Sequence, residues 1–133
     1  MIHGWIKLWR KLLNSNMYKS LTAHQRDVMI QCLLLANHEE REWEWEGVVF
    51  ECKPGQFITS LDSLKKLCAK NVSLKNIRTS LLKLEKWGFL ANKSAKTGRL
   101  ITICNWLSYQ GEEDINGKDN GKQPANSRQT AGN

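Results

Sequence analysis

Lysine, asparagine and threonine side chains gather on one side of a predicted helix over residues 73–88. When this segment is drawn with about 3.6 residues per turn, the arc opposite its apolar side chains carries no carboxylate. That arc holds Lys75, Asn76, Thr79, Lys83 and Lys86. Solvent-facing helix surfaces commonly mix both charge signs, because opposite charges four residues apart attract each other. Amides and hydroxyls can hydrogen-bond base edges and lysines can contact phosphates, so the arc predicts contact with DNA.

Further polar and basic side chains extend this candidate site. Ser73 precedes the helix, where free backbone N–H groups favour a phosphate. Arg78 lies at the edge of the apolar stripe, and a loop between two predicted strands adds three basic residues. The predicted DNA-binding residues are Ser73, Lys75, Asn76, Arg78, Thr79, Lys83, Lys93, Lys96 and Arg99. The alternative interpretation is an ordinary solvated surface, since lysine is common on helices.

The positive charge of the chain is confined to the same region. The 133 residues carry a formal net charge of +7. Residues 61–99 hold ten basic and two acidic residues, a net charge of +8, whereas residues 1–60 sum to zero and residues 100–133 to −1. A localised excess of this kind predicts a positive surface patch and a polyanionic partner.

Capping signals and apolar spacing predict the helices that position the site. Thr22 followed by Gln25 matches a capping box and begins a core helix over residues 23–36. Ser60 can cap a helix over residues 61–68, and Ser73 caps the helix that ends at Gly88. The expected buried stripes are Leu61, Leu64, Leu67 and Cys68 in the first of these two helices and Leu74, Ile77, Leu81 and Leu84 in the second.

Alternating residues and turn signals predict the strands. Trp43 and Trp45 share one strand face, and a turn at Glu46-Gly47 would place them opposite Phe50 and Val48. Pro54-Gly55 suits the two central positions of a type II turn. Further strands are expected over residues 56–59, 89–92 and 100–104.

The order of these elements predicts an α+β fold, a winged helix-turn-helix with an additional N-terminal arm and β-hairpin. Two helices joined by about four residues form the helix-turn-helix unit, and the basic loop between the last two strands forms the wing. This domain spans residues 1–110. Residues 111–133 contain one large aliphatic residue and no aromatic one, so they are expected to be a disordered polar linker or tail.

Other function classes find no support in the motifs. The sequence contains no glycine-rich phosphate loop, no nucleophile elbow and no ligand spacing among its three histidines and four cysteines, so we expect no enzyme, metal or cofactor. It also contains no long apolar segment that could span a membrane and no signal peptide. Reduced core cysteines are expected, and with them a cytoplasmic protein, associated with the nucleoid of a bacterial host.

Six tryptophans suggest a second use of the surface. Trp5, Trp9, Trp87 and Trp106 are expected in the core, whereas the hairpin could expose Trp43 and Trp45 to a partner. Apolar self-association would then use the N-terminal arm around Trp5 and Trp9, or the hairpin around Trp43 and Trp45.

Five stretches in this order resemble a known family: GWIKLWRKLL, LLLANHEERE, KPGQFITS, LLKLEKWGFL and ITICNWLSYQ. Together they are similar to the N-terminal domain of phage and prophage replisome organisers, relatives of the DnaD-type primosomal proteins. The resemblance covers roughly residues 4–110 and continues into the polar tail. It implies a winged-helix domain, a linker and a second helical domain in proteins that bind double-stranded DNA at origins and help to load the host replicative helicase.

The resemblance leaves three roles open. This chain stops in the linker, so contact with the host helicase or its loader would depend on a missing C-terminal domain. The winged helix could bind DNA for replication initiation, or serve as a self-association scaffold that forms a homo-oligomer, as it does in the DnaD relatives. A small winged-helix transcriptional regulator is the third alternative, because one fold supports several functions.

Overall fold

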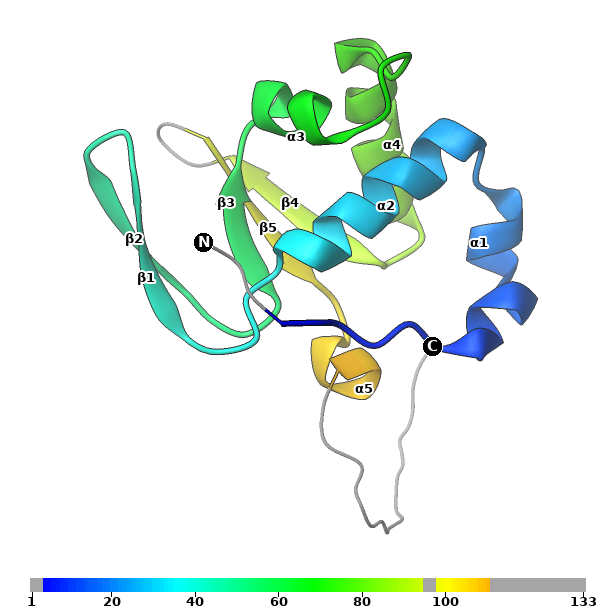
Figure 1. The fold of residues 1–133 in the computed structure, drawn as a ribbon, viewed down its shortest axis with the longest axis horizontal. Coiled ribbons are helices and arrows are strands. Elements are labelled where there is room, and N and C mark those ends of the chain that lie inside the picture. The colour runs from blue at the N-terminus through cyan, green and yellow to red at the C-terminus, as the bar shows by residue number, and fades with distance from the viewer. Residues whose placement is uncertain (1–3, 95–97, 111–133) are drawn as a thin grey trace, which may run out of the picture.

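The computed structural model describes residues 4–94 and 98–110, with the side chains of Trp43 and Trp45 outside the description. These residues form a mixed α+β fold (Figure 1). Its helical segments are η1 (Arg10–Asn14), α1 (Asn16–Ser20), α2 (Ala23–Leu35), α3 (Leu61–Leu67), α4 (Leu74–Lys86) and α5 (Trp106–Gln110). Its strands are β1 (Arg41–Trp45), β2 (Val48–Cys52), β3 (Gln56–Thr59), β4 (Leu90–Ser94) and β5 (Arg99–Ile103). The predicted tail over residues 111–133 lies outside the described residues.

The predicted starts of three helices are confirmed. In each, the side chain of the predicted N-cap residue accepts a hydrogen bond from a backbone N–H of the first turn. Thr22 and Gln25 form a capping box at α2, and Ser73 forms one with Asn76 at α4. The Ser60 side chain accepts from the N–H of Ser63 at the start of α3. These contacts satisfy donors that a helix start otherwise leaves unpaired, so local sequence alone sets the first residue of each helix.

A three-stranded antiparallel sheet follows the order β3-β5-β4. Phe57 pairs with Ile101 across β3 and β5, and Asn92 pairs with Ile101 across β4 and β5. The last two strands begin or end one or two residues from their predicted bounds, because β4 continues its pairing with β5 as far as Ser94. In Figure 1, α2 and α4 lie beside this sheet, and the hairpin β1–β2 stands next to β3.

The hairpin β1–β2 has the predicted register. Trp43 pairs with Phe50 and Trp45 with Val48. The turn between them uses Glu46 and Gly47, whose φ angles are 51° and 82°. Two successive positive φ angles match the twist of a two-residue hairpin loop. The loop therefore fixes the register and assigns every side chain of the hairpin to one of its two faces.

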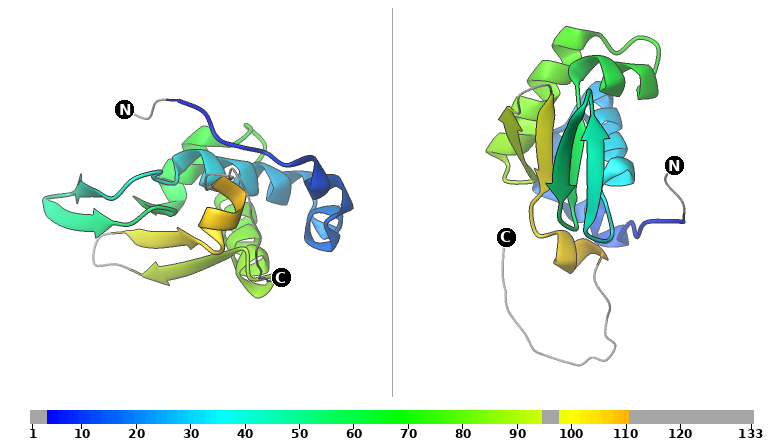
Figure 2. Two further views of the ribbon diagram at one scale, coloured as in Figure 1. Left: turned by 90° about the horizontal axis from the view of Figure 1, so that it is seen from below. Right: turned by 90° about the vertical axis from the view of Figure 1, so that its left-hand side faces the viewer.

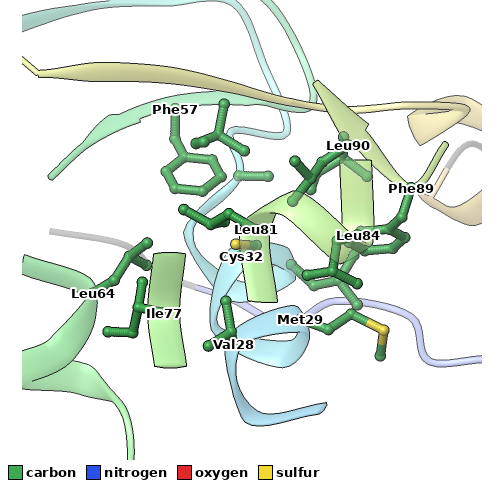
Figure 3. Packing of buried hydrophobic residues seen from close by; sticks show 14 of the residues in the cluster. Val28, Met29, Cys32, Phe57, Leu64, Ile77, Leu81, Leu84, Phe89 and Leu90 are labelled. Atoms are coloured by element: carbon green, nitrogen blue, oxygen red, sulfur yellow. The ribbon is translucent and has the colours of Figure 1, made fainter. Parts of the chain in front are cut away.

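The core lies between α2, α4 and the three-stranded sheet (Figure 3). Side chains from all three point toward one another there, among them Val28 and Cys32 of α2, Ile77 and Leu84 of α4, and Phe57 of β3. The prediction that Leu67 and Leu74 are buried in the core is wrong. Leu67 is 49% exposed and Leu74 is 36% exposed, because α3 and the first turn of α4 stand at the edge of the molecule. Ser80, which was not predicted to be buried, is a fully buried residue of α4. Its hydroxyl donates to the Asn76 carbonyl at 2.6 Å.

The turn between β2 and β3 is packed tightly against α5. The Gln56 N–H donates to the Lys53 carbonyl at 3.0 Å across Pro54 and Gly55, and Gly55 has φ 86°, as predicted for a type II turn. A Cβ atom at Gly55 would lie 2.7 Å from Cβ of Trp106. The Trp106 side chain of α5 therefore packs directly on this glycine.

The N-terminal arm and α5 hold each other in place, and the sequence did not predict α5. The Gln110 side chain accepts from the Lys7 N–H at 2.7 Å and donates to the Lys7 carbonyl at 2.8 Å. The Trp9 indole donates to the Tyr109 carbonyl at 2.7 Å. The arm is extended up to Trp9 and lies on the surface, so the prediction of buried tryptophans is confirmed only for Trp106. Trp5 is 76% exposed, Trp9 38% and Trp87 46%.

The four cysteines are free thiols. Burial raises the pKa of the Cys32 thiol to about 12, with a further contribution from Cys68. Burial and the Asp27 carboxylate raise the pKa of Cys68 to about 11. Thiols with such raised pKa values stay protonated at neutral pH and are poor nucleophiles.

Over the described residues, no helix is long and apolar enough to cross a membrane.

Cys32 is expected to make the fold sensitive to alkali. The unfolded chain releases this proton near pH 9, whereas the folded chain holds it until about pH 12. Stability present below pH 9 should therefore fall by about 1 kcal/mol per pH unit above it. Urea unfolding between pH 8 and 11, at roughly one-unit steps, measures the slope. Cys32→Ala should reduce the slope and leave the part contributed by Cys68, whereas replacement of half-buried Cys104 with alanine should reduce it less. Equal slopes for both variants would contradict the assignment.

Candidate nucleic-acid interface

The exposed face of α4 is mainly basic, and Glu85, the one acidic residue of the helix, is exposed at its edge beside Arg78. The face consists of Lys75, Arg78, Thr79, Leu82 and Lys86, which recur at helical spacing and are all exposed. We call these five residues the α4 basic face. The buried face of the helix, with Ile77, Leu81 and Leu84, lies on the other side. This geometry gives three cations a common direction, with an apolar side chain between them.

Two predicted polar contacts also serve the helix itself. The Asn76 side-chain oxygen accepts from the Ser73 N–H at 2.9 Å, and the Ser73 hydroxyl accepts from the Asn76 N–H at 3.0 Å. The Thr79 hydroxyl donates to the carbonyls of Lys75 and Asn76, both at 3.1 Å. Asn76 is therefore left with its amide N–H groups for an external partner, and Thr79 with its oxygen as an acceptor.

Lys83 points away from the α4 basic face. Its ammonium group donates to the Ser20 carbonyl at 2.9 Å, at the end of α1. A cation near the last carbonyls of a helix also interacts favourably with the helix dipole. The structure thus gives Lys83 a structural partner and separates it from Lys75 and Arg78, although all three are in one helix.

The remaining predicted contacts lie on β4 and β5. Lys93 is exposed and Arg99 is half-buried. Lys93 pairs with Leu100, and Ser94 pairs with Arg99, so the two basic residues come from adjacent strands of one hairpin. Lys96 lies outside the described residues.

The charged window also contains exposed residues that the predicted site omits. Lys65 and Lys66 are exposed in the last turn of α3, and Lys70 is exposed in the turn before α4. Leu82 is 55% exposed and Lys86 is exposed on the α4 basic face. Lys86 could have been selected from its place on the helical wheel. Leu82 also lies outside the predicted apolar stripe of this helix, but a search for polar and basic side chains does not select it.

Of the predicted self-association residues, the structure describes the side chains of Trp5 and Trp9. Trp5 is exposed on the arm, and Trp9 is tied to α5. The side chains of Trp43 and Trp45 lie outside the described part of the chain. Over the described residues, no group of three or more His, Cys, Asp or Glu side chains is placed to hold a metal ion.

Comparison with protein-family models found no match, and comparison with curated proteins and with solved structures found no significant one.

Proposed function

We propose that the chain is a winged-helix module that binds duplex DNA through the α4 basic face. The observation that carries this proposal is the exposure of Lys75, Arg78 and Lys86 on one face of a capped helix, with a single carboxylate, Glu85, at its edge. A phosphate backbone attracts such a face by releasing its own condensed cations.

The connectivity supports this use of α4. Helices α3 and α4 are joined by a short turn, and β4 and β5 follow as an antiparallel hairpin, with β5 between β3 and β4. In a winged helix-turn-helix the second helix of the unit enters the major groove, and the hairpin reaches the flanking backbone. Lys93 and Arg99 would then contact phosphates beside the groove.

The chemistry of the face suggests how each residue would contribute. Lys75 and Arg78 can contact phosphates or the acceptor atoms of guanine. The free acceptor of Thr79 suits an exocyclic amino group of adenine or cytosine, and Leu82 suits the methyl group of thymine. Lys86, in the last turn, is best placed for backbone phosphate, which contributes affinity but no sequence preference.

The biological setting that we propose is replication initiation of the phage type. The resemblance of residues 4–110 to replisome organisers supports it, and a role in transcription is the second candidate. Mapping the bound sites across the genome that encodes the chain separates the two. Sites inside a replication gene or origin support the first role, and sites at promoters support the second.

The direct test is a binding titration with labelled duplexes of about 20 base pairs, one of specific and one of scrambled sequence. With three to five basic side chains on phosphates, log K should fall with log salt at a slope between about −3 and −5. A duplex affinity that is absent at ~50 mM salt, or does not change with salt, would overturn the proposal.

A further inference from the structure

The hairpin β1–β2 presents an acidic face to solvent. Because side chains alternate along a strand, Glu42, Glu44, Val49 and Glu51 share one face, and all four are exposed. We call these four residues the hairpin acidic face. On the other face, Cys52 is buried and Phe50 is half-buried. The hairpin is therefore fixed to the body by one face, while the other is free.

The charges of this face oppose the stability of the hairpin. Glu42 lies directly across from Glu51, and Glu44 is next to Glu42 on the same face. Like charges directly opposite each other weaken a strand pair. No ion pair compensates these carboxylates among the described residues. Repulsion between carboxylates that no nearby cation offsets is typical of a surface that binds another molecule.

The α4 basic face matches this surface in charge and in its apolar residue. Val49 is 62% exposed among three carboxylates, and Leu82 is 55% exposed among three cations. An apolar contact surrounded by charged side chains is the common anatomy of a protein interface, because the surrounding groups exclude water from its centre.

The two faces do not meet within one molecule. In Figure 1 the hairpin stands beside β3, away from α4, and both views in Figure 2 keep the hairpin and α4 apart. A contact between them therefore requires two molecules.

We propose that the hairpin acidic face of one copy docks on the α4 basic face of a second copy. Glu42, Glu44 and Glu51 pair with Lys75, Arg78 and Lys86, and Val49 packs against Leu82. The contact needs no duplex and can be tested without one, but it uses the same face of α4 as the proposed DNA contact, so a docked copy and a duplex would exclude each other there. It joins two different surfaces, and each copy keeps one unused surface. Such contacts either close into a ring or continue into a chain of copies.

Sedimentation of the intact chain tests the contact without DNA. At ~50 mM salt the average mass should rise above 15.3 kDa as the protein concentration increases, and at ~0.5 M salt it should return to the monomer. Glu42→Lys/Glu44→Lys/Glu51→Lys and Lys75→Glu/Arg78→Glu/Lys86→Glu should each lower the association constant at least about tenfold.

Mixing the two reversed variants gives the decisive result. Each variant alone carries two faces of one sign, but an equimolar mixture again contains opposite faces, so association should return. Arg10→Glu/Lys19→Glu, which reverses two exposed charges outside both faces, should associate like the unchanged chain.

A chain that stays monomeric at ~50 mM salt, or two folded variants that stay monomeric when mixed, would overturn the proposal. Association that persists at ~0.5 M salt would overturn it too and would indicate the exposed tryptophan of the N-terminal arm as the contact. Circular dichroism of each variant confirms that it is folded before mixing.

Discussion

Replacing Lys75, Arg78 and Lys86 together with alanine is expected to lower the affinity for duplex DNA by a few hundred-fold at ~0.1 M salt. Each phosphate contact contributes about −0.9 to the slope of log K against log salt, so loss of three contacts flattens the slope by about 2.7. These side chains are exposed and do not pack in the core, so the variant should keep its fold. Fluorescence anisotropy over a range of salt concentrations measures both quantities.

Lys83→Ala is the matched control for this experiment. It removes one positive charge from the same helix, but the Lys83 ammonium group is bound to the Ser20 carbonyl. Its effect on the salt slope should be smaller than that of Lys75→Ala. If Lys83→Ala weakened binding as much as the triple variant, the α4 basic face would not be the contact surface.

Gly55→Ala is expected to destabilise the fold by about 2–5 kcal/mol. A non-glycine residue at the observed φ of 86° costs about 1–2 kcal/mol. The added Cβ would also lie 2.7 Å from Cβ and 2.8 Å from Cγ of Trp106, and overpacking of this kind costs about 1–3 kcal/mol more. Since a domain is stable by only about 5–15 kcal/mol, the melting temperature should fall by at least about 10 °C.

Gly47→Ala separates the two causes. Gly47 has a similar φ of 82°, but a Cβ there meets no atom within 4 Å. It should lose only about 1–2 kcal/mol, and thermal unfolding followed by circular dichroism compares the two variants. Equal losses of stability in the two variants would show that Trp106 can move away from residue 55 at no cost in free energy, and that the close approach is unimportant.

The features that the sequence predicted depend on neighbours in the chain. The boxes at Thr22 and Ser73 join residues three apart, and the Glu46-Gly47 turn sets the hairpin register within a few residues. The features that it missed depend on distant partners. Lys83 meets Ser20 across 63 residues, and Lys7 meets Gln110 across 103, so no local pattern records either contact.

Contacts between residues far apart in the sequence also limited the prediction of the candidate site. Residue type and helical spacing located Lys75 and Thr79 on one face, but they could not separate the Lys83 side chain from that face. They also assigned Leu74 to the core, although it is 36% exposed, because burial depends on what packs against a helix. Tertiary packing, and not helix propensity, decides those positions.

The pair of hydrogen bonds between Gln110 and Lys7 brings the two ends of the fold together at one pole. That pole lies at α5, opposite α3 in Figure 1 and in the right-hand view of Figure 2. A domain whose ends adjoin can be inserted into a loop of another protein, or circularly permuted, without stretching its backbone. A tag or fluorescent protein joined directly after Gln110 would start from this pole, so it would not crowd α3.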